Sequence, residues 1–270
     1  MVVVVVIVIL VLSGAGGFAA RRLLRTDSDA VAAAEGLDAG EMWTPVRILV
    51  SLMLAFVLVQ TFSSYQDAGD AATREAGAVS IEASSAGLLP TPAAADLVGS
   101  LRCYARAVAG PGWAELEATR HTSRISEQAA ARVQAAIGRA QTAGADSVLL
   151  SEIYSADRER VEARRVRLAE AAPSVPGVVT VLLVLCVAVT IGGTAALADR
   201  RMRPGLRYGL VAVTAVVFTA TLLVIFDLDR PFGGIAQIEP TDMRIVEEQL
   251  GASPLGANPP CDAQGAPLPA

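Results

Sequence analysis

Four long apolar blocks constrain this 270-residue chain more than any other feature of its sequence. They cover residues 1–20, 46–62, 176–197 and 208–226, and no charged residue lies in the centre of any of them. A run of about 18 or more apolar residues is long enough to cross the hydrocarbon core of a bilayer as a helix. The sequence therefore predicts an all-α integral membrane protein with four transmembrane helices.

The composition agrees with this prediction and argues against several kinds of chemistry. Charged residues make up 18% of the chain, below the ~25% that is typical of soluble domains. All 22 basic residues are Arg, and His121 is the single histidine. We therefore expect no catalytic residues, no cofactor and no metal site, because no nucleophile, base or ligand set can be assembled. The net charge of -5 argues against a nucleic-acid partner.

The loops next to the spans predict the orientation. The loops at 21–45 and 198–207 carry clusters of Arg, and the positive-inside rule places such loops in the cytoplasm. The region at 63–175 and both termini are then outside. A cleaved signal peptide is the alternative for the first block, although its basic residues follow the apolar run instead of preceding it. The absence of Lys with abundant Arg suggests a bacterial genome of high GC content. Together with the four predicted spans, this leads us to expect a multi-pass protein of the bacterial inner membrane.

Residues 63–175 have the pattern of helices with apolar stripes. Nothing breaks a helix between the second span and Pro90, so that span is expected to continue beyond the membrane. Pro90, Pro92 and the Gly-Pro-Gly triplet at 110–112 are expected breaks. Apolar residues recur at helical spacing between the breaks, which predicts about four amphipathic helices in a bundle.

The most distinctive polar segment follows the last span, at the start of residues 227–250, where a short helix is also expected. Besides one Leu it consists of Asp227, Asp229, Arg230, Pro231, Phe232, Gly233 and Gly234. Carboxylates at a helix C-terminus oppose its macrodipole, so we expect Arg230 or an Arg of the middle region to compensate them. One interpretation is a charged cap that ends the span and anchors Phe232 in the membrane interface. The other is a charged ring at the mouth of a pore or at an oligomer interface.

The C-terminal residues 251–270 are rich in Pro, Gly and Ala, which predicts disorder. Cys103 and Cys261 fall on the same side of the membrane in either orientation. They could form a disulfide if that side is oxidising, but two free thiols are the favoured alternative because Cys261 belongs to the tail. Cys186 lies within the third span and is expected to be a packing residue.

Four motifs occur in a fixed order along the chain. They are REAGAV at 74–79, YARAVAGPGWAEL at 104–116, RRVRLAEAAPSVPG at 164–177 and DLDRPFGG at 227–234. In this order the chain resembles the bestrophin-like DUF4239 family of bacterial membrane proteins, over about residues 65–243. The resemblance implies a likeness to bestrophin anion channels in span number and helical middle region. The expected orientation departs from that of bestrophins, whose termini and helical domain are cytoplasmic, and the spans have few aromatic residues.

Two functions from different classes stay open. The favoured one is a non-catalytic envelope protein whose helical domain binds a partner or senses a signal, because nothing in the spans looks like a selectivity filter. The alternative is an oligomeric, bestrophin-like channel that conducts ions, anions in particular. The partners expected under these hypotheses are the lipid bilayer, further copies of the chain and small ions.

Overall fold

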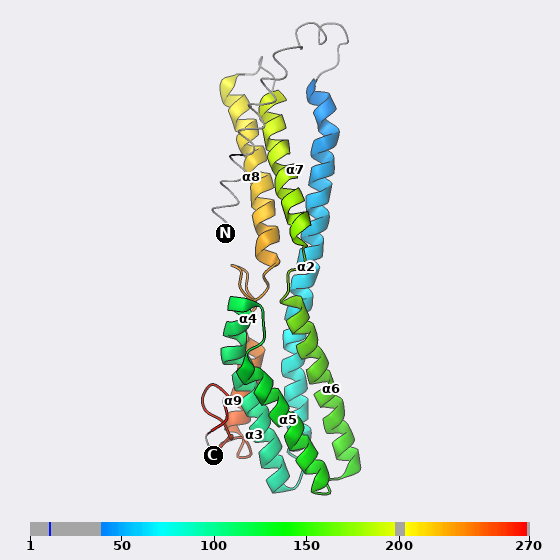
Figure 1. Cartoon of the computed structure of the whole chain (residues 1–270), viewed down its shortest axis with the longest axis vertical. Helices are drawn as coiled ribbons and strands as arrows, with labels where there is room; N and C mark the ends of the chain where they lie inside the picture. Colours follow the sequence, from blue (N-terminus) through cyan, green and yellow to red (C-terminus); the bar gives the residue numbers. More distant parts are fainter. Residues whose placement is uncertain (1–10, 12–38, 198–202, 269–270) are drawn as a thin grey trace. The chain divides into compact units, whose positions relative to one another are not determined.

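The structure is a computed structural model that describes residues 11, 39–197 and 203–268. Within these ranges every regular element is helical, which confirms the all-α prediction. The helices of Figure 1 are α2 (Ala39–Ala86), α3 (Thr91–Ala107), η1 (Val108–Gly112), α4 (Trp113–Thr119), α5 (Arg124–Thr142), α6 (Ser147–Glu170), α7 (Gly177–Leu197), α8 (Pro204–Leu228) and α9 (Thr241–Ala252). The span predicted at 1–20, residue 11 apart, lies outside the described residues.

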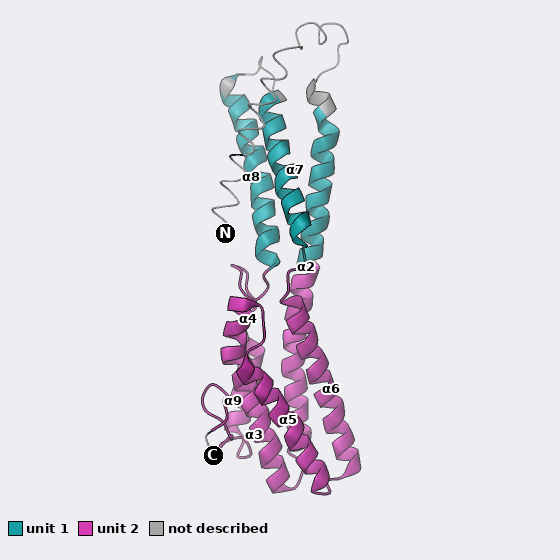
Figure 2. Cartoon of the chain, in the orientation of Figure 1, with its two compact units in different colours: residues 1–62, 174–229 teal, residues 63–173, 230–270 magenta. Residues whose placement is uncertain are grey.

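The chain divides into two compact units, which Figure 2 colours separately. Unit 1 comprises residues 1–62 and 174–229, and unit 2 comprises residues 63–173 and 230–270. Helix α2 contributes to both, because the boundary after Phe62 falls inside it. The prediction that the second span continues as one helix is therefore confirmed.

Three described helices are long and apolar enough to cross a membrane. They are α7 and α8, each with a mean hydropathy of 2.5, and α2, whose most apolar window has a mean hydropathy of 2.0. About 20 residues suffice for a span, and α2 carries Asp67, Asp70 and Arg74 beyond Phe62. We therefore place the membrane-spanning part of α2 before Ser63, in agreement with the predicted span at 46–62. The total of four spans stays a prediction.

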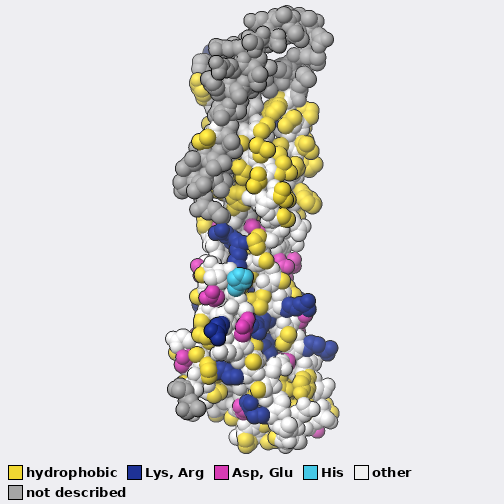
Figure 3. All heavy atoms as spheres, viewed as in Figure 1, with side chains coloured by type: hydrophobic (Ala, Val, Ile, Leu, Met, Phe, Trp, Pro, Cys, Tyr) yellow, Lys and Arg dark blue, Asp and Glu magenta, His cyan; other side chains and the backbone are white. Residues whose placement is uncertain are grey.

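Unit 1 has a small core and a large apolar surface. Its hydrophobic core consists of Val50, Leu54, Leu183, Val187, Ile191, Leu222 and Ile225. Large side chains on the outer faces of the same helices are exposed, among them Leu52, Phe56, Val181, Val213 and Val216. Figure 3 shows hydrophobic side chains gathered on the visible face of this unit. A surface of this kind is stable against lipid and is larger than soluble monomers normally expose.

Unit 2 is a helical bundle, as the sequence predicts. Helix α3 packs against both α5 and α9. The core contains residues from most helices of the unit, including Leu97, Leu101, Tyr104, Leu116, Val133, Ile137, Ile153 and Met243. This bundle holds the polar groups described below.

The break predicted at residues 110–112 is wrong. The triplet forms most of η1, a π-helical turn that joins α3 to α4 with all residues still helical. Pro111 lacks an amide hydrogen and crowds the preceding turn, and the wider π turn accommodates it. A Cβ on Gly112 would lie 2.3 Å from the Ser126 hydroxyl oxygen, so this glycine lets α5 pack against the turn.

The disorder predicted for residues 251–270 and the free thiols predicted for the tail are also wrong. Residues up to Ala252 belong to α9, and residues 253–268 form turns that follow the surface of unit 2. Cys261 is joined to Cys103 of α3 by a disulfide. Composition favours disorder only when a segment has no fixed partners, and here long-range contacts to α3 order it.

Candidate functional site

Asp229 ends α8 and is compensated by amide groups. Its Oδ1 accepts hydrogen bonds from the backbone N–H groups of Ser174 at 2.8 Å and Val175 at 3.0 Å, and from the Ser174 hydroxyl at 2.9 Å. These two residues lie just before α7, which begins at Gly177, so one carboxylate ties the end of α8 to the segment that leads into α7. The expectation that an Arg compensates this carboxylate is wrong, because backbone donors do so.

We predict that Asp229→Ala lowers the free energy of unfolding by about 1.5–3 kcal/mol, the loss typical of hydrogen bonds to a charged group. Asp229→Asn keeps an acceptor oxygen and should lose less than half as much. Thermal unfolding of the purified protein in detergent measures both changes. Equal melting temperatures for Asp229→Ala and the unmodified protein would contradict this role.

The residues after Asp229 fold into unit 2. Phe232 is buried, and its ring meets the Trp113 ring edge to face at a centroid distance of 5.2 Å. The Trp113 indole N–H donates to the Ile238 carbonyl at 3.0 Å, and the Ile238 N–H donates to the Pro231 carbonyl at 2.8 Å. The interface anchor predicted for Phe232 is therefore wrong, because its apolar ring completes the core of the bundle.

A small cavity of about 110 Å³ adjoins this segment. Its lining includes Arg120, Glu117, Arg230 and Phe232. Arg120 has φ 62° at the end of α4, and Gly233 packs closely enough that a Cβ there would lie 3.1 Å from the Glu117 carbonyl oxygen. The structure thus brings residues 230–233 of the predicted site together, while Asp227 and Asp229 belong to the end of α8 in unit 1.

A set of buried polar side chains begins at Trp113 and crosses the bundle. The Arg167 guanidinium lies over the Trp113 ring, 5.4 Å from its centroid. The same group pairs with Glu75, with 2.5 Å between Nε and Oε2 and 3.2 Å between Nη2 and Oε1. The Tyr104 hydroxyl donates to the same carboxylate. Glu75 of α2 is therefore satisfied by α3 and α6 together.

The set continues through Arg160 to the other side of the bundle. The Arg160 guanidinium lies 4.6 Å from the centroid of the Tyr104 ring and donates from Nε to Glu82 at 3.2 Å. It also pairs with Asp157, which accepts a further hydrogen bond from the side chain of Gln134. We call these eight residues the buried polar chain, of which Gln134 at the end is exposed and the other seven are buried: Trp113, Arg167, Glu75, Tyr104, Arg160, Glu82, Asp157 and Gln134.

The charges of this chain are nearly balanced. Arg160 and Glu82 are fully buried, and Glu82 Oε1 has no hydrogen-bond partner among the described residues. Burial raises the pKa of Glu82 to about 8, although the nearby Arg160 lowers it and Asp157 raises it further. Burial and the nearby Glu75 also raise the pKa of Tyr104. With Glu82 protonated, two guanidinium groups face two carboxylates.

The raised pKa of Glu82 predicts a pH dependence. The folded protein holds a proton that the unfolded chain, with a usual pKa of 4.5 at this residue, releases earlier. The stability contributed by this group is therefore complete below pH 4.5 and is lost as the pH rises towards 8. The shift from 4.5 to about 8 is about 3.5 pKa units, so at about 1.4 kcal/mol per unit we expect a loss of at most roughly 5 kcal/mol.

Thermal unfolding of the full chain between pH 5 and pH 9 tests this prediction. Glu82→Gln should flatten the pH dependence, while Glu152→Gln, on the exposed side of α6, should leave it unchanged. Parallel curves for Glu82→Gln and the unmodified protein would show that Glu82 does not hold this proton.

The sequence interpretation missed the buried polar chain, although a signal for it exists. Glu75 and Glu82 are seven residues apart on α2, and Arg160 and Arg167 are seven apart on α6. A separation of seven places two residues on the same helix face. Within the described ranges, no group of three or more His, Cys, Asp or Glu residues is placed to hold a metal ion.

Comparison with known proteins identifies the family of this chain. The model of the Bestrophin-like domain matches residues 37–243, which is most of the chain. The chain belongs to this bestrophin-like family. The resemblance drawn from the four motifs is therefore confirmed, and the buried polar chain lies within the matched region. The comparison with curated proteins gives no match.

Solved structures agree with the family. Crystal structures of a bacterial bestrophin homologue from Klebsiella pneumoniae, each with a point mutation, have the same fold. One matches with a TM-score of 0.74 and 13% identity, covering 96% of this chain and 99% of that chain. Another has a TM-score of 0.69 and 13% identity, covering 94% and 99%. At this identity the likeness establishes the fold: the chain is a helical, bestrophin-like membrane protein.

Proposed function

We propose that this chain is the subunit of an oligomeric channel in the inner membrane of a bacterium, and that it conducts small anions passively. The observation that carries this proposal is the bestrophin-like match over residues 37–243, supported by a fold that covers nearly all of a bacterial bestrophin homologue. The family and the fold favour the channel over the non-conducting envelope protein that the spans alone suggest. A channel also needs no catalytic residues or cofactor.

The surface of unit 1 is compatible with assembly. A groove of about 610 Å³ is lined by Ile48, Leu52 and Phe218 together with Thr44, Arg47, Ser51, Ala55 and Thr214. The hydroxyls of Thr214 and Ser51 donate to carbonyl oxygens of their own helices, at 2.9 and 2.8 Å. Both hydroxyl groups are therefore hydrogen-bonded, as a polar group that faces lipid needs to be. An ion pathway would form between copies of the chain, because ions need a polar route across the bilayer.

Ion flux into vesicles tests the proposal. Purified full-length protein in liposomes should release trapped chloride or iodide faster than empty vesicles and faster than vesicles with an unrelated multi-span protein. Arg165→Ala is a matched control, since this side chain is 81% exposed on α6, and it should conduct like the unmodified protein. Native mass spectrometry in detergent should show a closed oligomer. A folded monomer without flux would overturn the proposal and favour the partner-binding alternative.

A further inference from the structure

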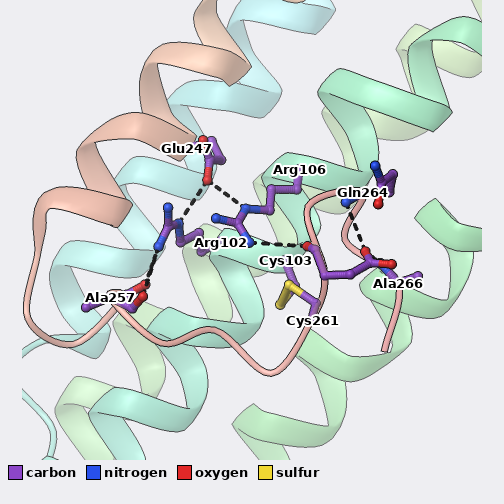
Figure 4. Close-up of polar contacts among 10 residues, drawn as sticks. Arg102, Cys103, Arg106, Glu247, Ala257, Cys261, Gln264 and Ala266 are labelled. Atoms are coloured by element: carbon purple, nitrogen blue, oxygen red, sulfur yellow. Dashed lines mark hydrogen bonds and ion pairs between the residues drawn. A yellow bond between two sulfur atoms is a disulfide. The ribbon is translucent and has the colours of Figure 1, made fainter. Parts of the chain in front are cut away.

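The C-terminal tail is fastened to α3 by a covalent bond. Cys103 and Cys261, 158 residues apart in the sequence, form a disulfide whose two residues are 1% and 5% exposed. Figure 4 shows the tail passing along α3 on both sides of this bond. We call residues 253–268 the strap. Since its central cysteine is buried in the bundle, the strap is part of the fold of unit 2.

Polar contacts hold the strap on either side of the disulfide. Arg102 donates from Nη1 to the Gly256 carbonyl at 2.8 Å, and Arg106 donates from Nη1 to the Asp262 carbonyl at 3.2 Å. Both guanidinium groups also bind Glu247 of α9, at 2.9 and 2.8 Å (Figure 4). The Asp262 carboxylate in turn accepts hydrogen bonds from two backbone N–H groups of the strap. One face of α3 is therefore built to receive it.

Glycines let the strap approach α3 closely. A Cβ on Gly99 would lie 3.2 Å from Pro260, and one on Gly265 would lie 2.5 Å from the Cys103 carbonyl oxygen. Gly265 also has φ +80°, a conformation that other residues rarely adopt. Its carbonyl accepts a hydrogen bond from Arg132 at 2.6 Å. The disulfide, the hydrogen bonds from Arg side chains and the close contacts at the glycines therefore all hold the strap in the same position against α3.

A buried structural disulfide indicates the compartment. Such bonds form and persist in oxidising environments, while the cytosol of most bacteria keeps thiols reduced. The short Arg-rich loop at 198–207 independently favours the cytoplasm by the positive-inside rule, because the Arg residues before α7 belong to a long region, and long regions cross the membrane largely regardless of charge. One span, α7, separates this loop from unit 2 in the sequence. Both observations place unit 2 on the opposite, oxidising side.

We propose that unit 2 lies outside the cytoplasm and that the strap is closed there by oxidation of Cys103 and Cys261. The two thiols release two protons and pass two electrons to the disulfide of a thiol-oxidising exchange protein, which becomes a dithiol. This inference rests on the inner-membrane placement of the proposed function and does not depend on conduction. It gives unit 2 the orientation opposite to the cytoplasmic helical domain of bestrophins.

Thiol trapping in cells tests the oxidation. Cells that express the Cys186→Ala protein are lysed in denaturant that contains N-ethylmaleimide, so that buried free thiols are blocked as well, and the protein is then reduced and treated with polyethylene-glycol maleimide. We expect two added polymer chains, because both cysteines were oxidised when trapped. Protein that gains no polymer chain would have contained free thiols and would overturn the inference.

Single-cysteine reporters test the orientation. In a background with Cys103, Cys186 and Cys261 each replaced by Ala, Ser151→Cys lies on the exposed side of α6 and Gly205→Cys lies at the exposed start of α8. A membrane-impermeant maleimide should label Ser151→Cys in intact spheroplasts and Gly205→Cys only after lysis. The reverse pattern would overturn the inference. These results are independent of flux, so they can fail while the channel proposal holds.

Discussion

Replacing Arg160 with alanine is expected to lower the free energy of unfolding by about 3–5 kcal/mol, the largest effect of any single substitution that we predict. Arg160 is fully buried and pairs with both Glu82 and Asp157. Its removal leaves two acidic groups in the core without their cation, and the desolvation cost of those groups is then uncompensated. For a unit of this size the melting temperature should fall by roughly 10 °C.

The control for this prediction is Arg165→Ala on the same helix. Arg165 is 81% exposed and its contact with Glu162 is 4.0 Å long, so its loss should change the melting temperature by little. Adding Glu82→Gln and Asp157→Asn to Arg160→Ala should restore part of the stability, because the two acidic groups that lost their partner are then removed. If Arg160→Ala and Arg165→Ala melt at the same temperature, the buried polar chain does not stabilise the bundle as described.

Removing the disulfide is expected to have the second largest effect. Cys103→Ala together with Cys261→Ala should lower the free energy of unfolding by about 2–5 kcal/mol, since the bond closes a long loop in the unfolded chain. The pair is separated by 158 residues, and the entropy cost of closing a loop in the unfolded chain grows with loop length. Residues 253–268 should also exchange their amide hydrogens faster, because the strap loses its covalent attachment.

Hydrogen exchange by mass spectrometry and thermal unfolding in detergent measure these two changes. Cys186→Ala is the matched control, because this cysteine is free and lies in α7. It should leave both exchange in the strap and the melting temperature near those of the unmodified protein. Unchanged exchange at residues 253–268 in the double variant would mean that the polar contacts to α3 hold the strap unaided.

Hydropathy predicts the described spans well, because whether a helix is apolar enough to lie in lipid depends on its own residues and not on distant contacts. Helices α7 and α8 agree closely with the predicted spans at 176–197 and 208–226. An apolar helix is stable in lipid by itself, because its backbone groups form hydrogen bonds within the helix. Pro90 likewise marks the start of α3 through its local effect on the backbone. These features depend on residues near in sequence, and periodicity and breaker residues report them directly.

Features that depend on distant contacts were predicted poorly. The strap contains the residues of a disordered segment and is ordered by α3 and by Cys103. The Gly-Pro-Gly triplet stays helical as a π turn, and Gly112 leaves room there for Ser126 of α5. Phe232 was assigned to the membrane interface, and its place against Trp113 could not be deduced without knowing that residues after Asp229 enter the bundle.

The candidate site shows the same division. The sequence predicts a charged segment that includes Asp227 and Asp229 after the last span, but it does not show the partners of Asp229, which are 54 and 55 residues away. The buried polar chain joins five helices, and the sequence shows only its heptad spacing on α2 and α6. A charged residue at such spacing fits a solvated face equally well, so burial had to come from the structure.

Current recording across a planar bilayer tests the central claim, a bestrophin-like ion channel, most directly. Full-length protein, first shown to be folded and oligomeric, is inserted between solutions of unequal chloride concentration. The account predicts discrete unitary current steps whose reversal potential moves toward that of chloride. A silent bilayer at high occupancy of folded oligomer, with active bestrophin channels recorded in the same lipid, would contradict it.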